Sequence, residues 1–165
     1  MIQGNTEKII TEAKRIEEDA EFSGKGHLNA ARLWAKIHYI IGVPMTFSAA
    51  LSGIFSINEN PQWAAIFALL ASTLGGLQTF INPEQKASSH KTSGNGFKEL
   101  GNKVRIFREI ELPQMDLQKT VENIVRFDGE RNQLNQTSLS IPRCAWWRAK
   151  KDIESGFSTY RVDCR

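Results

Sequence analysis

The sequence predicts an all-α membrane protein, in which a two-helix transmembrane hairpin is joined to amphipathic helices on the cytoplasmic side. Of its 165 residues, 41% are hydrophobic and 24% are charged, which are the averages of an ordinary soluble domain. The charges are unevenly spread, because the 47 residues from Ile37 to Pro83 contain only one, Glu59. The other 118 residues hold 38 of the 39 charged side chains. This segregation indicates two solvents, lipid for the uncharged window and water for the rest.

The uncharged window divides at Glu59 into two predicted spans, residues 37–58 and 61–82. A hydrocarbon core about 30 Å thick requires roughly 20 apolar helical residues, so both segments are long enough to cross it. Unbroken helix is expected because backbone amides in lipid must be satisfied within the segment. The alternative, two buried core helices of a soluble bundle, is disfavoured because the remaining residues are too charged to cover them. The chain therefore divides into residues 1–36, 37–83 and 84–165.

The flanking charges predict the orientation of the hairpin. Residues 22–36 carry Lys25, Arg32 and Lys36 and no acidic residue, and basic residues again predominate after the second span. The connecting turn, residues 58–61, has no positive charge. Since Lys and Arg remain on the cytoplasmic side, both termini are expected there, which makes this a multi-pass protein of the cell (inner) membrane.

Small and hydroxyl-bearing residues recur at four-residue spacing within the spans. They are candidates for helix packing or for lining a pore, and with the nearby polar Gln78 they comprise Ser48, Ser52, Gly53, Ser56, Ala68, Ser72 and Gly76. Small residues at this spacing allow helix backbones to approach closely. Two uses stay open: packing of the two helices against each other, and contact with neighbouring subunits or a water-filled path. Two helices cannot enclose a pore, so a channel would require a homo-oligomer.

Helical periodicity also appears on both sides of the hairpin. Before it, Ile9, Ala13, Ile16 and Ala20 predict a short amphipathic helix, which Gly24-Lys25-Gly26 should separate from the first span. After it, a stripe predicts a long helix that ends near Leu112-Pro113, and a second helical stretch continues to Thr137; the stripe is Phe97, Leu100, Val104, Phe107 and Ile110. Between the hairpin and this helix, Asn82 and Pro83 are candidates for a hinge, or Pro83 simply begins the helix.

The cytoplasmic parts show little sign of catalytic chemistry. His27, His38 and His90 lack metal-ligand spacing, and Cys144 and Cys164 have no partner pair. We therefore predict no catalytic, metal-binding or cofactor-binding residues, no cofactor and no enzyme activity. The modest basic surplus does not predict nucleic-acid binding. The tail RCAWWRAKK, residues 143–151, suits lipid headgroups or an anionic partner, or else buries Trp146 and Trp147 against the helices.

Several residues in order around the two spans resemble a known family. They are His27, Ala30, Ala31, Trp34, Gly42 and Pro44, then Asn82, Pro83, Ala87, His90, Gly94, Asn95, Phe97, Leu100 and Arg105, then ERNQLNQ, Ile141-Pro142 and IESGFSTYRVD. This arrangement resembles the SLATT family, two-transmembrane effector domains associated with SMODS nucleotide synthases and SLOG sensors. Phe97 stands where that family often has Tyr. Trp34, His90, Gly94, Phe97 and Arg105 are the candidate family motif.

The resemblance implies an effector of a bacterial conflict system for antiviral defence. In that family a sensor or a cyclic-nucleotide signal is thought to trigger oligomerisation of the hairpin into a pore, which ends in abortive infection. The partners implied are the lipid bilayer, further copies of the chain, and a sensor or nucleotide synthase. The competing hypothesis is a non-conducting membrane anchor or assembly protein that presents its cytoplasmic helices to a partner.

Overall fold

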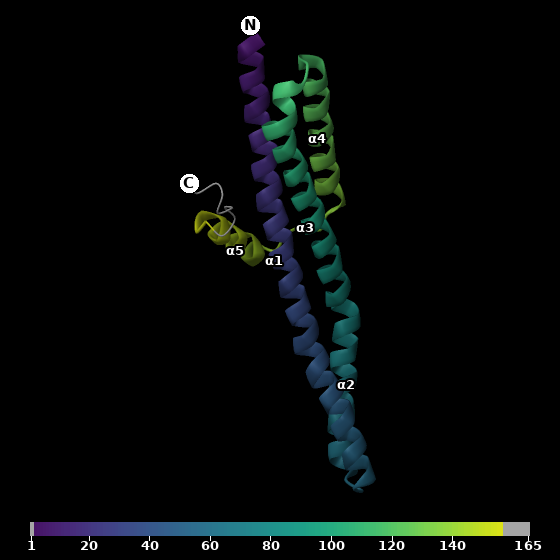
Figure 1. The fold of residues 1–165 in the computed structure, drawn as a ribbon. Helices are drawn as coiled ribbons and strands as arrows, with labels where there is room; N and C mark the ends of the chain where they lie inside the picture. Colours follow the sequence, from purple (N-terminus) through teal and green to yellow (C-terminus); the bar gives the residue numbers. More distant parts are fainter. Residues whose placement is uncertain (1, 157–165) are drawn as a thin grey trace. The chain divides into compact units, whose positions relative to one another are not determined.

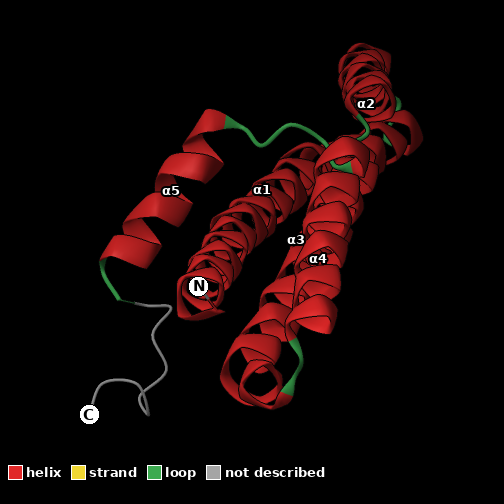
Figure 2. Ribbon diagram, turned by 90° about the horizontal axis from the view of Figure 1, so that it is seen from above, coloured by secondary structure: helices red, strands yellow, loops and turns green. Residues whose placement is uncertain are grey.

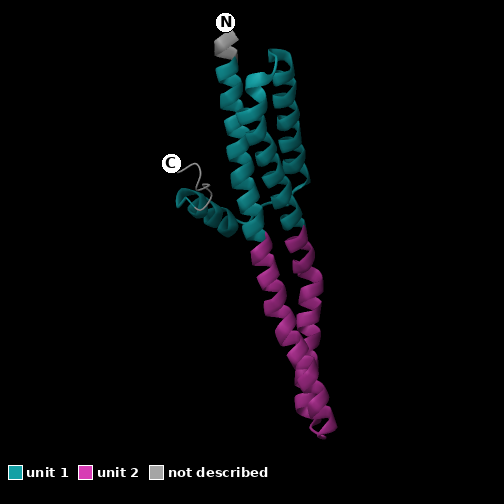
Figure 3. Ribbon diagram, viewed as in Figure 1, with its two compact units in different colours: residues 1–30, 89–165 teal, residues 31–88 magenta. Residues whose placement is uncertain are grey.

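A computed structural model describes residues 2–156, and all the regular secondary structure in that range is helical (Figure 1). The main helices are α1 (Ile2–Ile57), α2 (Pro61–Ile81), α3 (Pro83–Ile106), α4 (Leu117–Thr137) and α5 (Arg143–Glu154). The predicted all-helical fold is therefore confirmed. The chain forms two compact units: unit 1 comprises Met1–Ala30 with Ser89–Arg165, and unit 2 comprises Ala31–Ser88 (Figure 3).

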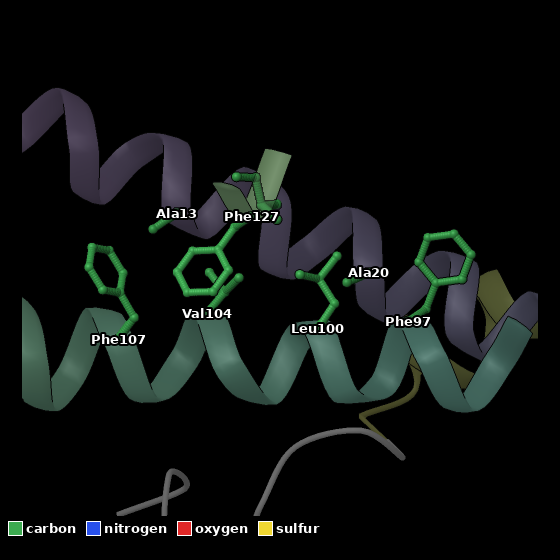
Figure 4. Close-up of a cluster of buried hydrophobic side chains, with 8 residues drawn as sticks. Ala13, Ala20, Phe97, Leu100, Val104, Phe107 and Phe127 are labelled. Carbon is green, nitrogen blue, oxygen red and sulfur yellow. The ribbon is translucent and has the colours of Figure 1, made fainter. Parts of the chain in front are cut away.

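Unit 1 is built around a hydrophobic core between α1, α3 and α4, which lie side by side (Figures 1 and 2). The core residues are at most 2% exposed, and Figure 4 shows most of them pointing into the space between the helices; they are Ala13, Ile16, Ala20, Phe97, Leu100, Val104, Phe107 and Phe127. These residues include most of the periodic apolar positions of the sequence. The stripes therefore mark the faces along which the helices pack.

The connection between α3 and α4 is compact. A π-helical turn, Phe107–Glu111, and a 3₁₀ turn, Leu112–Gln114, follow α3, which confirms the predicted end of the long helix near Leu112-Pro113. Phe107 opens the π-helical turn and remains buried, with its ring 5.4 Å from that of Phe127. Asp116 then caps α4, because its side chain accepts the backbone N–H of Lys119 at 2.9 Å.

One local expectation for unit 1 was wrong. Gly24-Lys25-Gly26 does not interrupt the first helix, since α1 continues through it. A glycine in a helix costs about 1 kcal/mol, but here the missing Cβ permits close contacts. A Cβ at Gly26 would lie 2.9 Å from Ile141 Cδ1, and one at Gly24 would lie 3.4 Å from the Gly94 carbonyl oxygen. The tail from residue 143, for which no secondary structure was predicted, forms helix α5 with Ala145 and Ala149 buried.

Unit 2 is an antiparallel pair formed by the second part of α1 and by α2. The chain reverses at residues 58–60, where Glu59 has a φ of 55°, and Pro61 begins α2. Gly42 faces Gln78, and Met45 faces Gly75 further along the pair. Both helices are long and apolar enough to cross a membrane, and only 11% of the most apolar window in α1 and 0% of that in α2 is buried. The two predicted spans thus fall on helices that expose their apolar residues.

Candidate functional site

The outward surface of unit 2 exposes many large apolar side chains. Helix α2 has no buried residue, and Phe80, Leu69 and Ile57 are 92%, 70% and 83% exposed. An exposed apolar surface of this extent marks contact with a membrane or with another protein. Small residues on this surface are therefore candidates for contact with a neighbouring copy.

The small residues of the spans divide into two sets. Within the pair, Ser48 is 4% exposed, and the Ser52 hydroxyl donates to the Ala64 carbonyl oxygen at 2.9 Å. Gly53 and Gly76 differ, because a Cβ added at either position would meet nothing within 4 Å. Gly53, Ser56, Ala68 and Ser72 are exposed, and Gly76 is half-buried. Some of these residues thus pack the two helices together, and others remain on the outside.

Helix geometry explains this division. Residues four apart in an α-helix are rotated by about 40° from one another, so a row of such residues winds around the helix. The partly buried residues of α2 instead follow steps of three and four; they include Ala64, Phe67, Ala71, Leu74 and Gln78. Ala64 lies in the contact between α1 and α2. Ala68 and Ser72, four and eight residues further on, are rotated away from this contact and lie on the outer surface.

One polar contact lies inside the apolar pair. Gln78 Nε2 and His38 Nδ1 are 3.3 Å apart, and the buried Gln78 Oε1 has no hydrogen-bond partner among the described residues. Gly42 adjoins this amide, because a Cβ there would lie 3.4 Å from Oε1. An unsatisfied buried acceptor is costly, and it is a place where water or a polar solute gains a hydrogen bond.

The candidate hinge lies at the end of α2. Asn82 has a left-handed backbone (φ 47°), and its N–H donates to the Gln78 carbonyl oxygen at 2.9 Å, which closes the helix. Pro83 is the first residue of α3, a position that suits proline because its missing N–H is not needed there. Pro83 thus begins the next helix, and movement about this junction stays a prediction.

A second candidate site lies inside unit 1, where two histidines meet. His27 of α1 and His90 of α3 are 3% and 2% exposed, and their Nδ1 atoms are 2.9 Å apart. Only one hydrogen fits between these atoms, so one ring donates and the other accepts. Phe97 stacks on His27 with ring centroids 5.6 Å apart. The pair is therefore closed off from water and held in one arrangement.

The surroundings disfavour the charged form of both rings. Burial, and secondarily the proximity of His90, lowers the pKa of His27 from 6.5 to about 4. Burial also lowers the pKa of His90. If both Nδ1 atoms carried protons, the hydrogen bond between them would be lost and two buried charges would face each other. Acid is therefore expected to disrupt this contact.

Glycines allow α1 and α3 to approach at the histidine pair. A Cβ at Gly94 would lie 2.8 Å from Leu28 Cγ and 3.1 Å from the Gly24 carbonyl oxygen. The close approach of the two backbones thus requires glycine at position 94.

The structure brings together only part of the family-like motif. His90, Gly94 and Phe97 lie along α3 at this crossing with α1. Trp34 lies in unit 2, where Lys86 Nζ is 4.5 Å from its ring centroid. Arg105 lies further along α3 and pairs with Glu109 at 3.9 Å.

The described residues offer no evident metal centre. None of them form a group of three or more His, Cys, Asp or Glu side chains that could hold a metal ion. Cys144 is an exposed free thiol on α5. Cys164 and the last residues of the IESGFSTYRVD motif lie outside the described part of the chain.

Known proteins add no further guide. No protein family, curated protein or solved structure compared with the chain matches it.

Sequence reasoning missed the histidine pair, although a signal for it exists. His27 lies 32 residues before Glu59 and His90 lies 31 residues after it. Two helices that reverse at one tight turn place residues at equal distances from the turn opposite each other. The contact between Gly42 and Gln78, which lie 17 residues before and 19 residues after Glu59, follows this rule to within two residues. The spacing of the two histidines from the turn could therefore have predicted their contact.

Proposed function

We propose that this chain is a membrane effector of a bacterial conflict system, which oligomerises in the inner membrane and permeabilises it when a sensor or nucleotide signal acts on the cytoplasmic helices. The observation that carries the proposal is the outward surface of unit 2, where Gly53 and Gly76 remain free although other residues already hold the two helices together. The biological setting comes from the resemblance to SLATT effectors, and the cytoplasmic termini come from the flanking charges.

The free glycines support assembly for a physical reason. Lipid tails are as apolar as leucine, so burying apolar surface does not drive helices together in a membrane. Association depends instead on close backbone approach at small residues. Gly53 and Gly76 offer such positions on the outside of α1 and α2. Several copies joined through them would surround a path that no single copy encloses.

A permeabilising effector must also have a silent state. Helix α1 belongs to both units, so a signal received by unit 1 has a continuous helix through which to act. A bundle that is stable in one arrangement and reorganises on binding can bias assembly in this way. The activating signal would therefore bind unit 1.

The competing function is a non-conducting anchor that presents unit 1 to a partner protein. It is favoured by an apolar row on α4, where Leu117, Val121 and Val125 are 40%, 46% and 66% exposed at four-residue spacing. Such a row is suited to contact with another helix. Replacing both spans with generic apolar helices separates the two functions, because an anchor keeps its activity after the exchange and a pore-forming effector loses it.

A pair of leucine substitutions on α2 tests the proposed assembly. Gly76→Leu adds bulk where a Cβ would meet nothing within 4 Å, whereas Thr73→Leu adds a leucine at an exposed position of the same helix. We expect Gly76→Leu to weaken crosslinked oligomers about tenfold, which corresponds to about 1.4 kcal/mol per contact. Membrane depolarisation after induction should fall with it, and Thr73→Leu should resemble the unchanged protein. Equal oligomers and equal depolarisation in both variants would contradict the proposal.

A further inference from the structure

We propose that α5 is a membrane-surface helix whose exposed face, formed by Arg143, Trp146, Trp147 and Lys151, docks on anionic lipid headgroups. This inference rests on the membrane-spanning role of unit 2 in the proposed function, but it requires no pore. It concerns residues 143–151, for which the sequence allows either contact with lipid headgroups or burial of the two tryptophans.

One side of α5 is already used within unit 1. Ala145 and Ala149 are 4% and 0% exposed. Near the other end of the helix, Asn29 Nδ2 of α1 donates to Asp152 Oδ2 at 3.3 Å. Ile141, just before α5, fills the space above Gly26. Helix α5 is thus attached to α1, away from α4 (Figures 1 and 2).

The exposed face combines aromatic rings with cations. Trp146 and Trp147 are 42% and 57% exposed, and their rings meet edge to face at 5.5 Å. Lys150 Nζ lies 5.9 Å and 5.6 Å from the two ring centroids. Arg143, Trp147 and Lys151 are spaced by four residues and therefore share one side of the helix. This exposure disagrees with the alternative in which Trp146 and Trp147 are buried against the other helices.

The charge of this helix suits an anionic surface. It carries four basic residues and two acidic ones, and both acids are engaged: Asp152 with Asn29, and Glu154 with Lys150 at 3.7 Å. Tryptophan favours the headgroup level because its ring is apolar and its N–H is polar. Basic residues add attraction to anionic lipids, and the two signals together give stable surface binding.

The attachment point favours lipid over other anionic partners. Gly26 and Asn29, which hold α5, precede the first predicted span at Ile37 by eleven and eight residues along the same helix. Headgroups of the membrane that this helix enters are therefore the anionic surface closest to α5 along the chain. A lipid partner also needs no matching protein surface, only a face that is aromatic and basic.

Fluorescence quenching in vesicles tests this docking. The full chain with Cys164→Ser is labelled at Cys144, which is exposed on α5, with an environment-sensitive fluorophore. It is reconstituted in phosphatidylcholine alone or with phosphatidylglycerol, each containing a lipid spin-labelled near the headgroup. We expect about threefold stronger quenching with phosphatidylglycerol, because basic residues near a surface respond to its charge. Arg143→Glu with Lys151→Glu should abolish the difference, and Glu154→Gln should increase it.

The control carries the same fluorophore at Gln136→Cys on α4, in a chain whose two native cysteines are serine. Quenching at Cys144 that is no stronger than at this site, or that is unchanged by the charge reversal, would overturn the docking surface. That is also the result expected if α5 binds an anionic protein, because the vesicles contain lipid alone. Circular dichroism of each variant confirms that the helices have formed. Depolarisation is measured separately, so its loss with quenching intact would overturn the pore-forming function and leave the docking surface supported.

Discussion

Units 1 and 2 treat the same residue types in opposite ways. Phe107 in unit 1 is fully buried, whereas Phe80 in unit 2 is 92% exposed. Unit 1 gathers Phe97, Phe107 and Phe127 into a core and places charges outside, as a protein in water does. Unit 2 leaves its large apolar side chains outside and places a hydroxyl and an amide within the pair, at Ser52 and Gln78. The difference teaches that the burial of a residue type must be interpreted with its solvent, since the exposure seen in unit 2 would be costly in water and is favourable in the lipid environment that we propose for it.

The two units also depend on different forces. In unit 1, removal of apolar area from water is the main stabilising contribution, and ion pairs such as Arg131–Asp19 at 2.9 Å join its elements. Exposed ion pairs of this kind contribute little. Under the proposed membrane-spanning role of unit 2, the main contributions there are backbone hydrogen bonds within each helix and close packing at small residues. Substitutions that are severe in one unit should therefore be mild in the other.

The largest effect is expected from removing a core phenylalanine. Phe107→Ala should lower the free energy of unfolding by about 3–5 kcal/mol, because it leaves a cavity in unit 1. Phe80→Ala is the matched control, and it should change stability by about 0.5 kcal/mol or less. Guanidinium unfolding of the full chain in detergent micelles, followed by circular dichroism, measures both. Equal losses in the two variants would remove the distinction between the units.

The next effect concerns insertion into the membrane. Leu69 is 70% exposed near the middle of α2, so Leu69→Arg should disfavour insertion by about 2.5–3.5 kcal/mol if that surface faces lipid. Ile110→Arg makes the same change at a 58% exposed position of unit 1 and should not affect insertion. The fraction of chain that resists alkaline extraction from membranes measures the difference. Full retention of Leu69→Arg would show that α2 does not cross the bilayer.

A smaller effect is expected from acid on unit 1. The pKa of His27 is lowered to about 4 in the folded chain and is near 6.5 when unfolded, so the unfolded state binds more protons between these values. Stability should therefore fall as the pH drops below 6.5, by on the order of 1 kcal/mol between pH 7.5 and 5.5. Guanidinium unfolding at several pH values measures this slope. The variant with both His27→Leu and His90→Leu should lose the pH dependence that the two histidines contribute. An unchanged slope in this variant would show that the histidine pair is not its source.

Sequence reasoning was right where the controlling physics is local. The apolar stripe from Phe97 to Ile110 predicted the core-facing side of α3 and of Phe107 just after it, because a helix repeats every 3.6 residues wherever it packs. Its last member, Ile110, lies in the π-helical turn and is 58% exposed, so the prediction fails there. It was wrong at Gly24-Lys25-Gly26 because a glycine penalty of about 1 kcal/mol is also local, and the contacts with Gly94 and Ile141 that outweigh it are not. It missed helix α5 for the same reason, since Ala145 and Ala149 become a packed face only when α1 lies beside them.

By itself the sequence determined the division between a charged and an uncharged part, because the absence of charge from Ile37 to Pro83, apart from Glu59, is a property of composition. Only the tertiary structure decided which small residues hold the helix pair and which remain outside, and that His27 meets His90. Those outcomes depend on the rotation and register of one helix against another. Rows of residues spaced by four wind around a helix of 3.6 residues per turn, so neither outcome is a property of the residues alone.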